Sequence, residues 1–169
     1  MATTSNTKAK AKKAKPTWTE KLEKEQQPQV VKLNAAQRMR WGGETMFIAT
    51  PQMLQQVIAK VPKGKLTTVN LIREKLAADN GTDVTCPITT GIFIWIVANA
   101  MEEARLAGRS KIVPYWRVLK EGGKLNEKYP GGIEAQTKQL EAEGFLVVPT
   151  KNGKGATVAG YEQKLYRFA

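Results

Sequence analysis

Residues able to recognise a ligand gather in the segment 111–126, which reads KIVPYWRVLKEGGKLN. Tyr115 and Trp116 are adjacent aromatic residues, and Arg117 follows them. Aromatic side chains can form the wall of a pocket for a base turned out of a duplex, because stacking contributes roughly 1–3 kcal/mol per base. The alternative is that one or both rings pack in the core beneath a hairpin. Arg117 either contacts a phosphate or braces the hairpin.

The supply of nucleophiles and bases is small. The sequence contains no histidine and a single cysteine, Cys86. The absence of histidine excludes Cys-His and Ser-His catalysis and removes the commonest zinc ligand. Cys86 lies near a predicted helix start, which lowers the pKa of a thiol, but no base is adjacent and Pro87 follows, which favours a packed structural cysteine. We therefore expect no catalytic residue, no metal ion and no cofactor.

The charge of the chain predicts a polyanionic partner. The net charge is +12, and the seven lysines and two glutamates of residues 1–24 supply +5 of it, which leaves +7 on the other 145 residues. A basic domain with a basic tail is typical of proteins that bind nucleic acid. The alternative is that the charge serves only solubility.

The elements that position these residues begin after a polar tail. Residues 1–29 have few large apolar side chains and many lysines, so we expect them to be disordered, and residues 30–169 to form one domain. No apolar run reaches the roughly 18–20 residues of a membrane span, and no apolar segment follows the N-terminal charge as in a secretory signal. We expect an intracellular monomer that does not contact a membrane.

Helix signals are clear from residue 50 onward. Thr50 is a predicted N-cap with Pro51 at the first helical position, and Thr68 is the next predicted N-cap. A third helix begins near Pro87 and ends at Gly108. It is apolar on most of its circumference, so much of it must be buried.

The second half of the chain predicts a basic hairpin and a fourth helix. Glu121-Gly122-Gly123 indicates a turn between two short strands, and GGIEAQTKQLEAEG predicts a helix that ends at Gly144. FLVVP then predicts a buried strand and KNGKG a second turn. Three helices followed by a basic hairpin are the order of a winged helix-turn-helix, an α+β fold. Lys120, Lys124 and Lys128 line the predicted hairpin, where they either follow a DNA backbone or belong to a solvated loop.

Three segments carry a resemblance to a known family. VPKGKLTTVNLI, IVPYWRVLKEGGKLNEKYPGG and LEAEG resemble the C-terminal DNA-binding domain of the O6-alkylguanine-DNA alkyltransferases and of their non-catalytic alkyltransferase-like relatives. The resemblance covers residues 50–144. It implies a winged helix-turn-helix domain that contacts DNA.

The resemblance also implies that alkyl transfer is lost. The enzymes carry Pro-Cys-His-Arg where this chain has Pro114-Tyr115-Trp116-Arg117, so the reactive cysteine is a tyrosine and the activating histidine is a tryptophan. A phenol with a pKa near 10 is a poor nucleophile without a base beside it. Glu143 corresponds to the relay glutamate of the enzymes. The alkyltransferase-like relatives, which carry a tryptophan in place of the cysteine, bind damaged DNA without repairing it. The implied function is non-enzymatic DNA binding, extending to the recognition of alkylated guanine.

Two departures from the family leave other functions open. Val69 stands where the family has a tyrosine that helps turn the nucleotide out, and no lysine or arginine occurs between Lys75 and Arg105, so the arginine that the family inserts into the base stack is missing. The start of the third helix can still contact phosphate through free N–H groups and the hydroxyls of Thr89 and Thr90. The alternatives are a repurposed domain that binds a protein or small ligand, its tail giving only non-specific nucleic-acid affinity, and alkyl transfer to Cys86.

Overall fold

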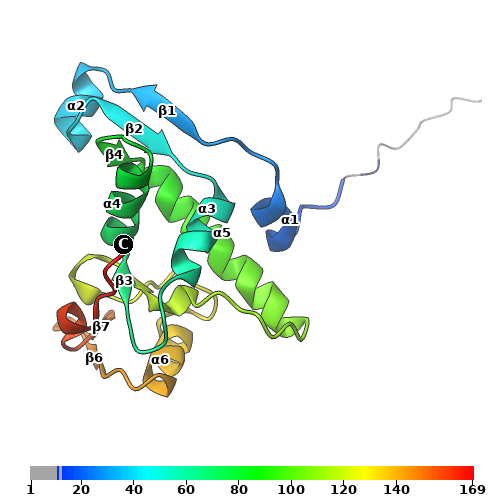
Figure 1. Ribbon diagram of the computed structural model, residues 1–169. Coiled ribbons are helices and arrows are strands. Elements are labelled where there is room, and N and C mark those ends of the chain that lie inside the picture. The colour runs from blue at the N-terminus through cyan, green and yellow to red at the C-terminus, as the bar shows by residue number, and fades with distance from the viewer. Residues whose placement is uncertain (1–10, 12) are drawn as a thin grey trace, which may run out of the picture.

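The computed structural model describes residue 11 and residues 13–169. Residues 1–10 and 12, which belong to the predicted disordered tail, lie outside the described residues. The described part is a mixed α+β arrangement of six α-helices and three small sheets, which confirms the α+β class. Figure 1 shows a long central helix with a sheet toward one end of the molecule and a small hairpin toward the other.

Three helices at the predicted positions form the centre of the molecule. They are α3 (Pro51–Ala59), α4 (Val69–Asp79) and α5 (Pro87–Leu106). The Thr50 hydroxyl accepts a hydrogen bond from the Met53 N–H at 3.3 Å, and the Thr68 hydroxyl accepts one from the Leu71 N–H at 3.2 Å. Both predicted N-caps are confirmed, because such caps depend only on residues within one turn.

The main hydrophobic core forms where α5 meets its neighbouring helices. Helix α5 buries side chains on most of its circumference, as predicted; they are Thr90, Ile94, Val97, Ala98, Ala100, Met101 and Ala104. Leu54 and Ile58 of α3 and Ile72 of α4 are fully buried against it. This helix therefore fixes the relative positions of the elements that surround the candidate site.

The prediction that the chain is disordered up to residue 29 is wrong for the last part of this segment, because helix α1 (Trp18–Glu23) packs on α5. Thr17 and Glu20 form a capping box at its start, and Leu22 is buried. The Trp18 ring lies edge-on against Trp95 at 4.6 Å between centroids. These tertiary contacts, made by one buried leucine and one docked tryptophan, order the short amphipathic helix. The low overall hydrophobicity of residues 1–29 does not reveal such contacts.

A small sheet covers the start of α5. It consists of β1 (Gln29–Lys32), β2 (Thr45–Ile48) and β4 (Val84–Thr85), with helix α2 (Ala35–Trp41) between the first two strands. Strand β1 pairs with β2 antiparallel, and β2 pairs with β4 parallel. Leu33, Met46 and Cys86 form a separate buried cluster under this sheet.

The predicted hairpin around residues 121–123 is largely absent. Strand β5 (Val118–Leu119) pairs parallel with β3 (Thr67–Thr68), and Lys120 and Lys124 form only a single antiparallel bridge across a 3₁₀ turn. Val118 and Leu119 are fully buried, and such side chains favour pairing in the interior over an exposed hairpin.

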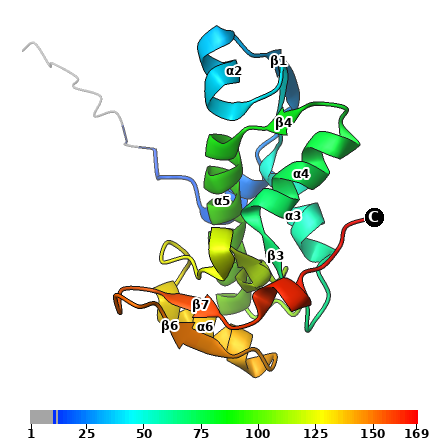
Figure 2. The same cartoon turned by 90° about the vertical axis from the view of Figure 1, so that its left-hand side faces the viewer.

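The antiparallel hairpin of the described chain lies further on. Helix α6 (Gly132–Ala142) follows the 3₁₀ turn at the predicted place, and then β6 (Val147–Pro149) pairs with β7 (Ala156–Val158). Strand β6 is half-buried, not buried as predicted. Figure 2 shows the turn of this hairpin projecting at the lower left. None of the described helices combines the length and the apolar character that a membrane crossing requires.

Candidate functional site

Tyr115 lines a cavity of about 360 Å³ between α5 and α6. It begins the 3₁₀ turn Tyr115–Arg117, which directly precedes β5, and only 5% of its surface is exposed. Its ring packs edge-on against Trp116 and Tyr129, with centroids at 5.5 and 5.4 Å. The other residues around the cavity are Glu102, Arg105, Pro130, Gly131, Ala135, Lys138 and Gln139.

A left-handed glycine shapes one side of this cavity. Gly131 precedes α6 with a φ of 76°. A Cβ atom at this position would lie 2.5 Å from the Cβ atom of Ala135, which also lines the cavity. Only glycine therefore allows both the turn and the close approach to the first turn of the helix.

The polar groups of the cavity are a carboxylate, a guanidinium and a neutral phenol. Arg105 donates a hydrogen bond from Nε to Glu102 at 2.9 Å, and this contact holds the pKa of Glu102 below its usual value. Burial, followed by the nearby charge of Glu102, raises the pKa of Tyr115 to about 12. At neutral pH the cavity therefore presents hydrogen-bond donors and acceptors beside the largely buried Tyr115.

Trp116 does not line this cavity, and its indole Nε1 donates to Glu143 at 3.0 Å. The side chain packs between the main core and a second core cluster that includes Leu119 and Leu140. Of the two rings that the sequence predicts as one pocket wall, Tyr115 lines a cavity and Trp116 is part of the core. This outcome combines the two alternatives that the sequence left open.

Arg117 braces the interior, the second of the two roles that the sequence left open for it. It donates to Glu143 from Nε at 2.9 Å and from a terminal nitrogen at 2.6 Å, and to the Val61 carbonyl at 2.6 Å. The side chains of Arg117 and Glu143 are only 11% and 9% exposed. Glu143, which corresponds to the relay glutamate of the enzymes, thus has two partners, Trp116 and Arg117.

The predicted hydroxyl contacts at the start of α5 are not available to a phosphate. Thr90 is 1% exposed and its hydroxyl donates to the Cys86 carbonyl at 2.6 Å. The Thr89 hydroxyl is also buried and has no hydrogen-bond partner among the described residues. Thr90 thus lies on the buried face of α5, whereas Thr89 is half-buried with its hydroxyl oxygen covered.

The outer face of α5 is apolar, which the sequence reading missed. Ile88, Ile92 and Trp95 are 55%, 48% and 39% exposed, at a spacing of four and three residues. Such residues share one helix face. The spacing of these three residues is visible in the sequence. It does not distinguish one exposed face, because the helix is apolar on nearly every side.

Cys86 is buried beneath the β1–β2–β4 sheet, as expected for a structural cysteine. It directly precedes α5, whereas Glu102 and Arg105 of the Tyr115 cavity lie near the other end of that helix. Sixteen residues of α-helix span about 24 Å. The thiol is therefore remote from the cavity.

Lys120, Lys124 and Lys128 are at the surface, as predicted. Lys120 pairs with Glu127 at 3.0 Å. The Lys128 side chain, which follows the predicted hairpin, is exposed. Lys120 and Lys124 border a groove of about 450 Å³ that also involves the β6–β7 hairpin. No cluster of three or more potential metal ligands occurs among the residues that the structure describes.

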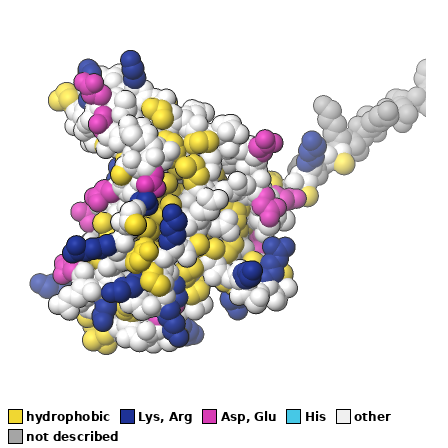
Figure 3. Space-filling model, in the orientation of Figure 1, with side chains coloured by type: hydrophobic (Ala, Val, Ile, Leu, Met, Phe, Trp, Pro, Cys, Tyr) yellow, Lys and Arg dark blue, Asp and Glu magenta, His cyan; other side chains and the backbone are white. Residues whose placement is uncertain are grey.

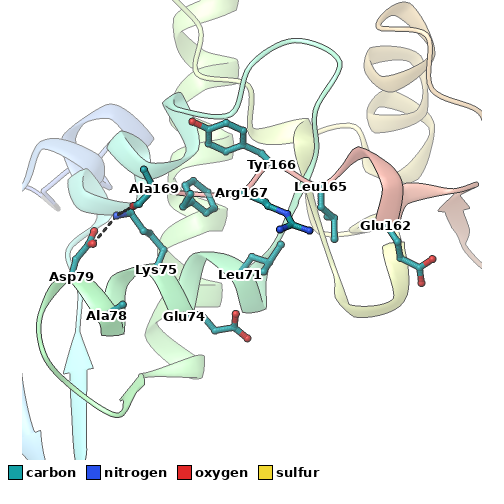
Figure 4. A pocket seen from close by; sticks show the side chains of 11 residues that line it. Leu71, Glu74, Lys75, Ala78, Asp79, Glu162, Leu165, Tyr166, Arg167 and Ala169 are labelled. Atoms are coloured by element: carbon teal, nitrogen blue, oxygen red, sulfur yellow. Dashed lines mark hydrogen bonds and ion pairs between the residues drawn. The ribbon is translucent and has the colours of Figure 1, made fainter.

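A further cavity, of about 520 Å³, lies between α4 and the C-terminal segment (Figure 4). Leu71, Leu165 and Phe168 give it an apolar lining, and Lys75 closes one side by hydrogen bonds to Asp79 and to the Ala169 carbonyl. It contains none of the residues that the sequence singled out. We assign it no role.

Comparison with known proteins gives two solved structures. No protein-family model and no curated protein matches the chain. One of the two structures is S. pombe Atl1 in complex with damaged DNA containing O6-carboxymethylguanine, with a TM-score of 0.48. The other is S. pombe ATL in complex with DNA, with a TM-score of 0.46. Each is 19% identical to this chain and covers 69% of it and 94% of its own length. Both are alkyltransferase-like proteins, the group that the sequence motifs resemble.

Proposed function

We propose that this protein binds DNA without transferring an alkyl group, and that the Tyr115 cavity receives a guanine alkylated at O6. The observation that carries the proposal is the position of Tyr115: it stands where the related enzymes have their reactive cysteine, and its ring lines a cavity of about 360 Å³. In this proposal α4 and α5 act as the helix-turn-helix, and the protein works as an intracellular monomer.

The chemistry of the site supports binding over transfer. With a pKa of about 12, the Tyr115 phenol stays protonated at neutral pH and is a weak nucleophile. Trp116 takes the place of the activating histidine, but its indole is only a donor and is engaged by Glu143. Arg105 and Glu102 can hydrogen-bond the polar edge of a base that enters the cavity beside Tyr115.

Affinity for the duplex comes from positive charge outside the cavity. The N-terminal lysines together with Lys120, Lys124 and Lys128 neutralise phosphates in this proposal. Because each such contact releases a counterion, binding falls steeply as salt rises. The uncharged α5 then contributes shape rather than charge.

A titration of the full chain against two duplexes, one with O6-methylguanine and one with guanine, tests the proposal at low and at higher salt. We expect tighter binding of the modified duplex. A Gln139→Trp variant should lose this preference, because the larger side chain fills the cavity, while a matched Gln163→Trp variant outside the cavity should keep it. Equal binding of both duplexes by the unaltered protein removes the lesion part, and absence of binding removes the proposal.

Transfer to Cys86 has its own test. The protein is incubated with alkylated DNA and its intact mass is measured. We expect an unchanged mass, because the thiol is buried and remote from the cavity. A mass increase by one alkyl group would show that the protein is an enzyme.

One observation favours a second candidate function, the binding of a protein. The exposed face formed by Ile88, Ile92 and Trp95 is apolar, which suits a protein partner better than a phosphate backbone. A chain that starts at Pro16 separates the two candidates, because it lacks the lysine-rich segment but keeps α1. DNA affinity of this chain at low salt supports the first candidate, and its complete loss supports the second.

A further inference from the structure

Two segments that are distant in the sequence bring four lysines to one groove. The groove, of about 450 Å³, is bordered by Lys120 and Lys124 after β5 and by Lys151 and Lys154 in the β6–β7 turn. Lys151 and Lys154 lie outside residues 50–144, the part of the chain that resembles the alkyltransferase family. On the face drawn in Figure 3, Lys and Arg side chains gather over the lower part of the molecule, where Figure 1 places α6, β6 and β7.

Backbone contacts hold the two sides of the groove together. The Leu125 N–H donates to the Ala156 carbonyl at 2.9 Å, and Lys124 forms a β-bridge with Thr157. Gly123 has a φ of 74°, and a Cβ atom there would lie 2.3 Å from the Tyr161 ring. Because this close packing admits no side chain, the segment that carries Lys120 and Lys124 has a fixed position relative to the hairpin.

The turn that carries the other two lysines is also ordered by hydrogen bonds. The Thr150 N–H donates to the Gly155 carbonyl at 2.9 Å, and the Gly155 N–H donates to the Thr150 hydroxyl at 3.1 Å. The Asn152 side chain accepts from the Lys154 N–H at 3.1 Å. Lys151 and Lys154 therefore extend from a closed turn.

The charge of the groove is mostly uncompensated. Lys120 pairs with Glu127, but Lys124, Lys151 and Lys154 have no ion-pair partner in the described part of the chain. Four lysines and one glutamate leave a charge of +3 around a groove lined with Leu125 and Ile133. Several like charges held close together are stabilised by a polyanion.

We infer that the lysine groove, defined by Lys120, Lys124, Lys151 and Lys154, is a second contact surface for the backbone of duplex DNA, with the β6–β7 hairpin as the wing. The inference rests on the proposed function. It moves the wing from residues 116–126, where the sequence placed it, to the hairpin at 147–158. Each lysine that reaches a phosphate adds about 0.9 to the steepness of log affinity against log salt.

The experiment compares two double variants of the full chain on one unmodified duplex over a range of salt concentrations. K151E/K154E reverses two charges in the groove, and K32E/R38E makes the same charge change near β1 and α2, at the opposite end of the molecule in Figure 1. We expect K151E/K154E to bind at least about tenfold more weakly, with a salt slope less steep by about 2. The K32E/R38E variant should change the affinity less than about threefold and leave the slope unchanged.

The outcomes distinguish the two proposals. If the unaltered protein binds and both variants lose affinity equally, the groove assignment is wrong and DNA binding stands. If the unaltered protein binds no duplex, the proposed function fails and the groove assignment fails with it. A K151A/K154A variant removes the two charges without reversing them and should give the same change of the salt slope if phosphate contacts are lost. It replaces K151E/K154E if circular dichroism shows that K151E/K154E is unfolded.

Discussion

At the scale of single residues, Glu143 joins three parts of the molecule. Its carboxylate accepts hydrogen bonds from Trp116 and Arg117, and Arg117 in turn donates to the Val61 carbonyl ahead of β3. The 3₁₀ turn that carries Tyr115 is thereby attached to the end of α6 and to the segment after α3. Because the pair is almost fully buried, its geometry determines where the Tyr115 ring points.

The Glu143→Ala variant should lose stability. Removing one partner leaves the Arg117 guanidinium buried without a counter-charge, which costs about 3–5 kcal/mol. Glu143→Gln should cost less, since the amide oxygen still accepts from the indole. Urea unfolding measures these changes, with Glu134→Ala as a control in the exposed Glu134–Lys138 pair, where a loss of less than about 1 kcal/mol is expected. Equal costs for the two glutamates would contradict the bracing role.

Tyr115 couples stability to alkaline pH. Its pKa in the folded protein is about 12, whereas that of an unfolded tyrosine is near 10. Between these two values the folded state holds a proton that the unfolded state has lost, so stability falls as the pH rises. Burial raises the pKa of Tyr129 in the same direction.

Unfolding measured from about pH 9 to about pH 12 should therefore show a loss on the order of 2–3 kcal/mol from Tyr115 alone. The Tyr115→Phe variant keeps the ring without the ionisable group, and its stability should decline less over this range. Below about pH 9 the difference in stability between the two proteins should no longer depend on pH. Parallel pH profiles would show that the phenol is not the responsible group.

At the scale of elements, α1 is attached to α5 by a carboxylate at its start. Glu103 accepts hydrogen bonds from the Trp18 and Thr19 N–H groups and from the Thr19 hydroxyl, each at 2.9 Å. A negative side chain suits the free N–H groups at a helix start. These hydrogen bonds, the Trp18–Trp95 contact and the buried Leu22 together hold α1, which is too short to be stable alone.

Glu103→Ala should release α1 while the rest of the fold remains. We expect amide hydrogen exchange of residues 18–23 to accelerate at least roughly tenfold, because opening of this element no longer breaks the Glu103 contacts. Exchange within α6 should stay as it is. A Glu74→Ala variant on the exposed face of α4 is the matched control. Unchanged protection of α1 in the Glu103 variant would mean that apolar packing alone holds it.

At the scale of the whole molecule, positive charge and the apolar α5 face occupy different parts of the protein. The lysine-rich segment precedes α1, the lysine groove lies at the β6–β7 hairpin, and α5 carries no basic residue before Arg105. A duplex that contacted both basic regions would extend along the molecule rather than rest on one helix. Affinity would then be shared among several weak, salt-sensitive contacts.

A chain that starts at Pro16 measures the share of the tail. It lacks five lysines but retains Thr17, so the capping box of α1 remains intact. The slope of log affinity against log salt should become less steep by up to about 4.5 if every lost lysine reaches a phosphate. Binding to duplex at several salt concentrations provides the value. An identical slope in both chains would show that the tail makes no phosphate contact.

Features that depend on neighbours along the chain could be predicted. The N-caps Thr50 and Thr68, the proline at the start of α5 and the glycine stop after it act within one helical turn, and the structure has them where the sequence places them. These predictions succeed because local backbone geometry and the hydrogen bonds of one turn suffice to decide them.

Contacts between distant segments were decided only by the tertiary structure. The sequence shows a hairpin signal at 121–123, yet β5 pairs with β3 some 51 residues earlier because both strands are buried. It shows a polar tail, yet Glu103 binds α1 across 84 residues. It shows Trp116 and Arg117 beside Tyr115, yet in the structure Trp116 and Arg117 bind Glu143 in the interior, whereas Tyr115 lines the cavity. Which partner wins depends on what each group buries or neutralises, and that is settled only when the chain has folded.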